Sequence, residues 1–207
     1  MHPNLAFRKP SHAQNLDFAQ ERGFGILSIN GENGPIASHI PFVLSADKTI
    51  IDAHLVRSNP IVSTLGKAAH SPAVLMVSGP DGYISPDWYE IEDQVPTWNY
   101  VAVHLRGRLE LRAKDTLKDH LTELSHQFEQ RLQPKPEWLL DKVNDAALER
   151  LMHMIVPVRL QIETVEGTWK LSQNKDDQAR LRASGAVEGG TGQELLALAG
   201  LMRDIAD

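Results

Sequence analysis

The chain has 207 residues, of which 42% are hydrophobic and 23% are charged, a balance typical of a globular protein with one sizeable core. Its net charge of −6 weighs against non-specific nucleic-acid binding, which depends on Lys and Arg neutralising phosphates. Cysteine is absent, which excludes disulfides and zinc–thiolate sites. No apolar run approaches the ~18 residues of a membrane span, and the N-terminus lacks an apolar signal stretch. We therefore expect a cytoplasmic protein.

The first half of the chain predicts a short helix followed by an antiparallel meander. The helix is expected over residues 11–22, with Gly23 as its stop. Three strands are expected at 23–30, 35–44 and 49–56, joined by short turns. Asn59 then caps a short helix that begins at Pro60, and an apolar strand is expected at 72–79.

The second half contains the clearest strand pattern. Apolar and polar residues alternate from Val101 to Arg112, and Val101, Val103, Leu105, Leu109 and Leu111 are expected on the buried face. Beyond it, the spacing predicts an amphipathic helix over 117–128, a short helix from Asn144 to Met152, a last long strand over 156–163 and a helix over 175–183. Residues 184–192 resemble a flexible linker in composition, and 195–205 predicts a short amphipathic helix.

These elements predict a mainly β fold, in which six or seven antiparallel strands form a small barrel with helices at the crossovers and at the C-terminal end. We expect the barrel domain to cover residues 1–183. A linker and a C-terminal helix would then make up residues 184–207.

Familiar catalytic motifs are missing from the sequence. It has no phosphate-binding GxxxxGK[ST] loop, no GxGxxG, no HExxH and no GxSxG. The nine histidines are scattered without the spacing of metal ligands, so we expect no metal site. His120 and His126, six residues apart, are not expected on one helix face.

Aromatic residues gather between residues 79 and 107, which hold all three tyrosines and two of the four tryptophans. Polar residues accompany them at two junctions between loop and strand, Ser85 to Tyr89 and Thr97 to Tyr100. Aromatic faces stack on flat heterocycles, and hydroxyls and backbone amides at such junctions hold phosphate or ring heteroatoms. The alternative is an aromatic mini-core beneath a long loop. The acidic residues 90–93 are expected to form a solvated loop between the two junctions.

Two further polar clusters follow strands. His54, Arg57, Ser58 and Asn59 lead into a helix N-terminus, a natural position for an anion, although helix capping with a surface arginine explains them equally well. Trp169 and Lys170 lie beside Ser172, Gln173 and Asn174 after the last expected strand. Three such clusters in one small barrel favour a ligand site over three unrelated coincidences.

Four segments carry a family resemblance, namely HLVRSNP (54–60), GPDGYISPDWY (79–89), VPTWNYVAVHLRG (95–107) and WKLSQNK (169–175). In this order and spacing they resemble the PaiB-like proteins, FMN-binding negative transcriptional regulators. The resemblance implies the FMN-binding split barrel, similar to pyridoxamine-phosphate oxidase. It also implies FMN as cofactor and a homodimer with the flavin in a groove between subunits.

The same resemblance implies a role for each cluster. One cluster would face the flavin phosphate: His54, Arg57, Ser58 and Asn59. A second would approach the flavin or the dimer partner: Ser85, Trp88 and Tyr89. The ring pocket would be lined by Thr97, Trp98 and Asn99. The site would be closed by Lys170, Ser172 and Gln173, and backbone groups would come from His39 and Ile40.

Three functions follow as hypotheses. The first, favoured by the resemblance, is a flavin-binding regulator with promoter DNA as a partner, whose best basic patch is the strand face of His104, Arg106, Arg108 and Arg112. That face is also typical of a solvated barrel wall. The second is a flavin-dependent oxidoreductase, for which no dedicated acid or base stands out, and the third is a non-catalytic flavin or haem sensor.

Overall fold

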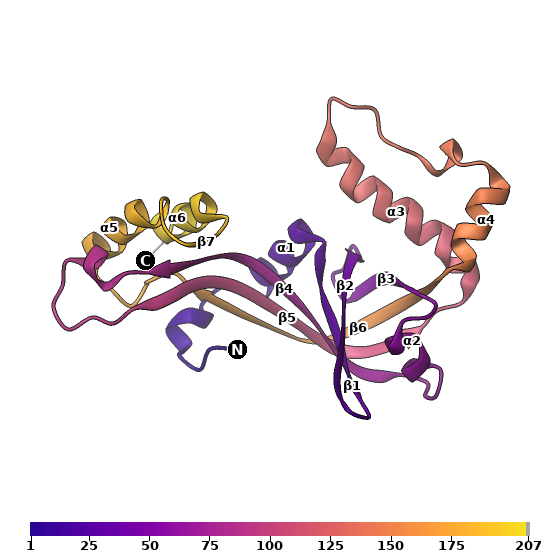
Figure 1. Ribbon diagram of the computed structural model, residues 1–207, viewed down its shortest axis with the longest axis horizontal. Helices are drawn as coiled ribbons and strands as arrows, with labels where there is room; N and C mark the ends of the chain where they lie inside the picture. Colours follow the sequence, from indigo (N-terminus) through magenta and orange to yellow (C-terminus); the bar gives the residue numbers. More distant parts are fainter. Residues whose placement is uncertain (206–207) are drawn as a thin grey trace. The chain divides into compact units, whose positions relative to one another are not determined.

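The computed structural model describes residues 1–205, and its strands form one antiparallel sheet (Figure 1). The strands are β1 (Phe24–Gly31), β2 (Gly34–Leu44), β3 (Ile50–Val56), β4 (Ser71–Ile84), β5 (Thr97–Leu111), β6 (Ile155–Lys170) and β7 (Gly192–Gln193). Their order in the sheet is β1-β2-β3-β6-β5-β4-β7. The predicted mainly β, seven-stranded antiparallel architecture is therefore confirmed.

An additional pairing closes part of this sheet. Besides β2, strand β1 also pairs with β4, through the register from Ile26 with Met76 to Ile29 with Ala73. Because β1 has partners on both sides, the six strands β1-β2-β3-β6-β5-β4 form a ring. Over the segments that are paired in this way the strands have no free edge, which is the defining property of a barrel.

Helices occupy the crossovers and the C-terminal part of the chain, as the sequence predicts. They are α1 (His12–Arg22), α2 (Pro60–Leu65), α3 (Leu117–Glu129), α4 (Asp145–His153), α5 (Asp177–Val187) and α6 (Leu195–Arg203). The side chains of Asn59 and Asn144 cap α2 and α4 by accepting from Ile61 N and Ala147 N. None of the helices within residues 1–205 is long and apolar enough to span a membrane.

The chain divides into two compact units. The barrel unit consists of Leu16–Met76 and Leu105–Val165, and the terminal unit consists of Met1–Asn15, Val77–His104 and the chain from Glu166 onward. Strands β4, β5 and β6 have residues in both units.

Apolar side chains from every strand of the ring fill the barrel unit, with Phe42, Leu105, Leu109 and Leu160 fully enclosed. Gly107 of β5 is required by a close approach between strands: a Cβ at this position would lie 1.8 Å from the backbone oxygen of Gln161 on β6. Leu111, expected on the buried face, is instead 38% exposed because β5 ends there.

In the terminal unit α5 packs against α6 (Figure 1), around Val187, Leu198 and Met202. The prediction of a flexible linker over 184–192 is wrong at its start, since Ser184–Val187 form the last turn of α5. Ser184 Oγ donates to the carbonyl of Leu181, and Val187 is fully buried, so this turn is held by a hydrogen bond and by packing. The division of the chain at residue 183 stays a prediction, and residues 206 and 207 lie outside the described part.

Three strands extend further than the sequence predicts. β5 begins at Thr97 because Asn99 continues its inward-facing row, and a polar residue at a buried position obscures the alternation. β4 runs to Ile84 through Gly82, where a Cβ would approach Leu198 of α6 within 2.8 Å. β6 reaches Lys170, so Trp169 and Lys170 belong to the strand rather than to the loop after it.

Candidate functional site

The terminal unit contains nine of the fifteen predicted site residues. They are Ser85, Trp88, Tyr89, Thr97, Trp98, Asn99, Lys170, Ser172 and Gln173. They come from the end of β4, the following short helical turn Pro86–Tyr89, the start of β5, and the end of β6 with the turn beyond it. Three predicted segments that are distant in sequence therefore meet within one unit.

Ser172 is the centre of a buried hydrogen-bond cluster in this unit. Its hydroxyl lies 2.7 Å from the hydroxyl of Tyr89 and accepts a hydrogen bond from Nδ2 of Asn99 at 2.8 Å. Ser172 is 2% exposed and Asn99 is fully buried. Burial raises the pKa of Tyr89, which keeps its hydroxyl protonated and able to donate to Ser172.

The backbone of Ser172 is strained. Its φ of 65° lies in the left-handed region, which is unfavourable for a residue other than glycine. Such a conformation persists only where the surroundings fix it, and here the two side-chain hydrogen bonds of the hydroxyl do so. Tyr89, Asn99 and Ser172 thus form a structural cluster that positions the segments on either side of them.

Lys170 and Trp98 are the predicted residues whose side chains are suited to contact a ligand. The partners of the Lys170 ammonium are uncharged, namely the hydroxyl of Thr97 and the ring of Phe7, 5.9 Å from the nitrogen. Burial lowers the pKa of this lysine. Trp98 is 46% exposed, and its ring lies edge-on to Tyr83 with the centroids 6.4 Å apart. A half-buried cation and an exposed aromatic face are suited to a flat, electron-rich ligand.

Three other predicted residues have local roles. Oε1 of Gln173 accepts from the backbone N–H of Leu171 at 2.7 Å, and its Nε2 donates to the backbone oxygens of Ala6 and Trp169. Ser85 precedes the turn Pro86–Tyr89 without a side-chain capping bond. Trp88 lies in that turn, with its ring beside Gly190. The acidic residues 90–93 are exposed, as predicted.

The other six predicted residues, His39, Ile40, His54, Arg57, Ser58 and Asn59, lie in the barrel unit. Asn59 caps α2 and also donates to Oγ of Ser38 on β2 at 3.1 Å. The guanidinium of Arg57 donates to the backbone oxygens of His153 and Ile155 at 2.8 and 3.2 Å. These bonds fix the loop before α2, while Ser58 at its tip is exposed.

On β2 the two predicted neighbours face opposite ways. His39 is exposed and stacks on Phe24 of β1, with the ring centroids 6.3 Å apart, whereas Ile40 belongs to the barrel core. From the sequence we expect the backbone groups of His39 and Ile40, and not their side chains, to contact the flavin. Both residues are paired with β1, His39 opposite Ile26 and Ile40 opposite Gly25.

A histidine pair joins β3 to α3. Nδ1 of His54 lies 3.0 Å from Nε2 of His120. Burial lowers the pKa of both, and for His120 the value falls to about 4, with the neighbouring His54 as a second cause. The sequence signal for His120 was its position three residues after Leu117 and four before Leu124, on the buried face of the helix. His54 could not be recognised as its partner, because 66 residues separate the two.

Comparison with known proteins gives a family match and several relatives. Residues 1–164 match the model of a family described as "Putative FMN-binding domain". The chain is 34% identical over 172 residues to the "Protease synthase and sporulation protein PAI 2" of Bacillus subtilis (strain 168), a match that covers 82% of this chain and 81% of the relative. The uncharacterized protein YKL070W of Saccharomyces cerevisiae is 35% identical over 120 residues, 53% of this chain and 69% of that protein.

Solved structures share the fold. The FAD and haem binding protein from Mycobacterium smegmatis superimposes with a TM-score of 0.57 at 16% identity, covering 90% of this chain and 82% of that one. The flavocytochrome Anf3 from Azotobacter vinelandii gives a TM-score of 0.57 at 15% identity, covering 82% and 72%. At these identities the likeness shows the fold alone, and that fold is the split barrel predicted from the sequence.

Proposed function

The chain belongs to the family of FMN-binding domains, and from that premise we propose that it is an FMN-binding negative regulator of transcription of the PaiB type. FMN is the cofactor of this family, and the observation that carries the proposal is the family match over residues 1–164, most of the chain. FMN, when bound, supplies electron or hydride transfer at its ring. The protein would supply binding, orientation and electrostatics.

The terminal unit offers groups that fit the flavin ring. Trp98 presents an exposed aromatic face of the kind that stacks on a flat heterocycle. Lys170 offers an ammonium whose present partners are a hydroxyl and an aromatic ring, so it is available to an electron-rich carbonyl or ring nitrogen. In this proposal Tyr89, Asn99 and Ser172 act behind these two residues, as the buried cluster that positions them.

The barrel unit offers groups that fit a phosphate. The exposed hydroxyl of Ser58 and the guanidinium of Arg57 lie in one loop, and two backbone carbonyls hold that guanidinium in place. Arginine is the side chain best matched to phosphate oxygens. Asn59 uses its amide to cap α2 and to contact Ser38, so its proposed role is to fix the loop.

Substitutions at Lys170 and Trp98 test this placement. We expect Lys170→Ala and Trp98→Ala each to raise the Kd for FMN about tenfold or more, because each removes one charge-assisted contact or one stacking surface. The measurement is a titration followed by quenching of FMN fluorescence. Lys142→Ala serves as the control, since Lys142 is an exposed lysine of the barrel unit. Wild-type affinity in both site variants would refute the placement.

Homodimer formation is part of the proposal. Large apolar side chains that remain exposed support it, including Leu5, Val95 and Leu196 in the terminal unit and Phe24 and Met154 in the barrel unit. Side chains of this size are available to be buried against a second copy. Light scattering of the purified protein measures the mass directly, and a monomer at micromolar concentration would argue against the dimer.

The regulatory role is supported by the relative PAI 2, which is named for protease synthesis and sporulation. We expect a band shift of promoter DNA at low salt that weakens as salt rises, because phosphate contacts release counterions. The face of β5 is a poor candidate for this contact, since Arg108 pairs with Glu163 at 2.8 Å and Arg112 contacts Glu110 at 3.3 Å. Arg108→Gln should therefore leave the shift unchanged. No shift at low salt, with or without FMN, would count against direct DNA binding.

A further inference from the structure

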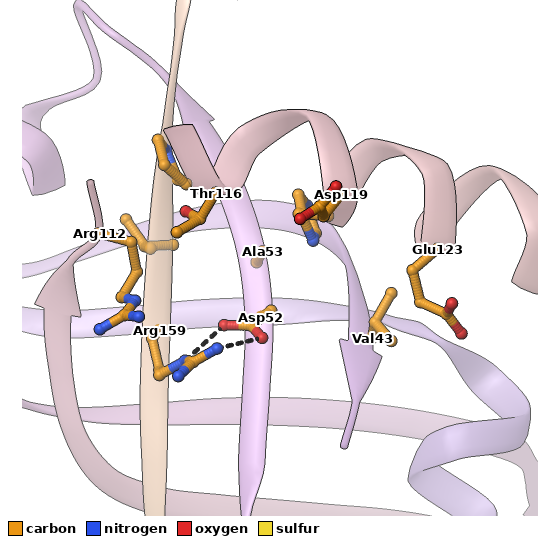
Figure 2. A pocket seen from close by; sticks show the side chains of 11 residues that line it. Val43, Asp52, Ala53, Arg112, Thr116, Asp119, Glu123 and Arg159 are labelled. Carbon is orange, nitrogen blue, oxygen red and sulfur yellow. Dashed lines mark hydrogen bonds and ion pairs between the residues drawn. The ribbon is translucent and has the colours of Figure 1, made fainter. Parts of the chain in front are cut away.

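A cavity of about 400 Å³ opens in the barrel unit beside α3, at a place that none of the fifteen predicted flavin residues lines. Its walls come from β2, β3, β6, the segment that joins β5 to α3, and the first two turns of α3 (Figure 2). The volume is in the range of small-molecule sites. Apolar walls, with Val43, Ala53 and Val158 among them, are combined with charged groups, as in sites that bind a small polar ligand with an aliphatic part.

In one part of the cavity wall, the charges of Arg159 and Asp52 neutralise each other. Arg159 donates from Nε and Nη2 to the two carboxylate oxygens of Asp52, both at 2.7 Å (Figure 2). This bidentate geometry uses the full face of the carboxylate, and it raises the pKa of the arginine. The pair therefore forms a fixed part of the wall, with little charge to offer a ligand.

The other charged groups in the wall are not matched. The cavity lining holds two arginines and three carboxylates, so its formal charge is −1. Asp119 and Glu123 on α3 are exposed and take part in no ion pair within residues 1–205, and the charge of Glu123 helps to raise the pKa of His126 on the same helix. Arg112 makes a single 3.3 Å contact with Glu110, and its buried Nε has no hydrogen-bond partner in that part of the chain.

The positive and negative groups of the wall lie in different parts of the cavity. Figure 2 shows Arg112 on one side of the cavity and Glu123 on the other, with Asp119 between them. Arg112 thus puts a positive charge on one side of the cavity, Asp119 puts a negative charge in the middle, and Glu123 puts a second negative charge on the other side. A ligand that satisfies all three groups carries one carboxylate and two ammonium groups.

His120 also lines the cavity. It is 8% exposed, and its Nδ1 has no hydrogen-bond partner among the described residues. Its Nε2 is held by His54 at 3.0 Å, so the ring is fixed in orientation. The lowered pKa keeps the ring neutral at pH 7, so it does not repel an ammonium group. In either tautomer Nδ1 can meet a polar group of the ligand.

We propose that this cavity binds a small basic amino acid, with its carboxylate on Arg112 and its two ammonium groups on Asp119 and Glu123. A simple monoamino acid leaves one of these carboxylates unmatched, and a diamine leaves Arg112 facing a cation. The ligand's net charge of +1 complements the charge of −1 in the cavity lining. None of the fifteen residues proposed for FMN lines this cavity, although His120 in its wall lies 3.0 Å from His54.

Calorimetric titration with L-lysine tests the proposal, with pentane-1,5-diamine and 6-aminohexanoate as probes that each lack one group. We expect saturable lysine binding to the wild-type protein, with each analogue weaker by about tenfold or more because one charged contact is lost. Arg112→Gln should bring lysine down to the affinity of the diamine. Glu123→Gln, an exposed helix position that leaves the fold intact, should weaken lysine and the diamine together.

The control is Arg108→Gln, which removes an exposed arginine of β5, four residues before Arg112 and outside the cavity, and should bind lysine like the wild type. No saturable binding of lysine at about 10 mM would overturn the proposal. Equal affinity for lysine and pentane-1,5-diamine would overturn the role of Arg112 and indicate a cation site alone. FMN affinity is measured on the same variants, and its retention in Arg112→Gln and Glu123→Gln distinguishes failure of this site from failure of flavin binding.

Discussion

Replacing Ser172 with alanine is expected to lower the free energy of unfolding by about 3 kcal/mol, because it strands two buried polar groups at once. Without the Ser172 hydroxyl, the hydroxyl of Tyr89 loses its 2.7 Å partner, and Nδ2 of Asn99 keeps only a 3.5 Å contact with Sδ of Met202. Ser172→Gly loses the same bonds, but glycine adopts the left-handed backbone without steric cost. It should therefore be about 1 kcal/mol more stable than Ser172→Ala.

Urea denaturation of the two variants measures both effects. Tyr89→Phe removes one member of the cluster and leaves Ser172 with its Asn99 partner, so a smaller loss of about 1 kcal/mol is expected. Ser63→Ala, at an exposed position of α2, is the control and should stay within about 0.5 kcal/mol of the wild type. A Ser172→Ala protein as stable as this control would show that the cluster does not hold the segment. A lower free energy of unfolding for Ser172→Gly than for Ser172→Ala would contradict the claim that the backbone of Ser172 is strained.

The His54–His120 pair makes the fold sensitive to acid. The pKa of His120 is about 4 in the folded protein, below its ordinary value of 6.5, because of burial and the neighbouring His54. As pH falls through 6.5, His120 is protonated in the unfolded chain but stays neutral in the folded chain. The free energy of unfolding therefore decreases towards pH 4. Between pH 7 and pH 5 we expect His120 alone to account for a loss of about 2 kcal/mol.

Comparison of denaturation at the two pH values in the wild type and in His120→Gln isolates this contribution. The variant should lose less stability on acidification. His126→Gln is the matched control on the same helix: a hydrogen bond with Glu137 raises the pKa of His126, so acid favours that contact rather than opposing it. Removing His126 should not reduce the loss. Equal losses in the wild type and in His120→Gln would mean that His120 is not kept neutral by the fold.

The strands and helices were largely predictable because apolar residues alternate or recur at helical spacing in most of them. The pattern failed where a buried position is polar or lacks a side chain. Asn99 obscures the start of β5, and the strand expected at 72–79 stops short of Gly82, which has no side chain and lies where β4 continues against α6. The last turn of α5 was missed because composition alone does not reveal that Val187 is buried.

The sequence predicted which groups of residues could form a site, but it did not predict the role of each residue. The sequence indicated three polar–aromatic clusters, and three segments of them do meet in the terminal unit. The left-handed backbone of Ser172 could not be anticipated, since serine gives no signal for it. The cavity beside α3 was missed because Asp52 and Arg159 are distant in sequence from Arg112 and Asp119, and because all four are residue types common on protein surfaces. The oxidoreductase and sensor alternatives stay predictions.

Flavin binding by the purified protein tests the central claim most directly. The measurement is a fluorescence titration of FMN beside riboflavin, which has the same ring without the phosphate. We expect saturation near one FMN per chain with a Kd in the micromolar range or tighter, and riboflavin weaker by about tenfold or more because it lacks the charged contact. FMN fluorescence and absorbance that do not change on addition of the protein would contradict the account.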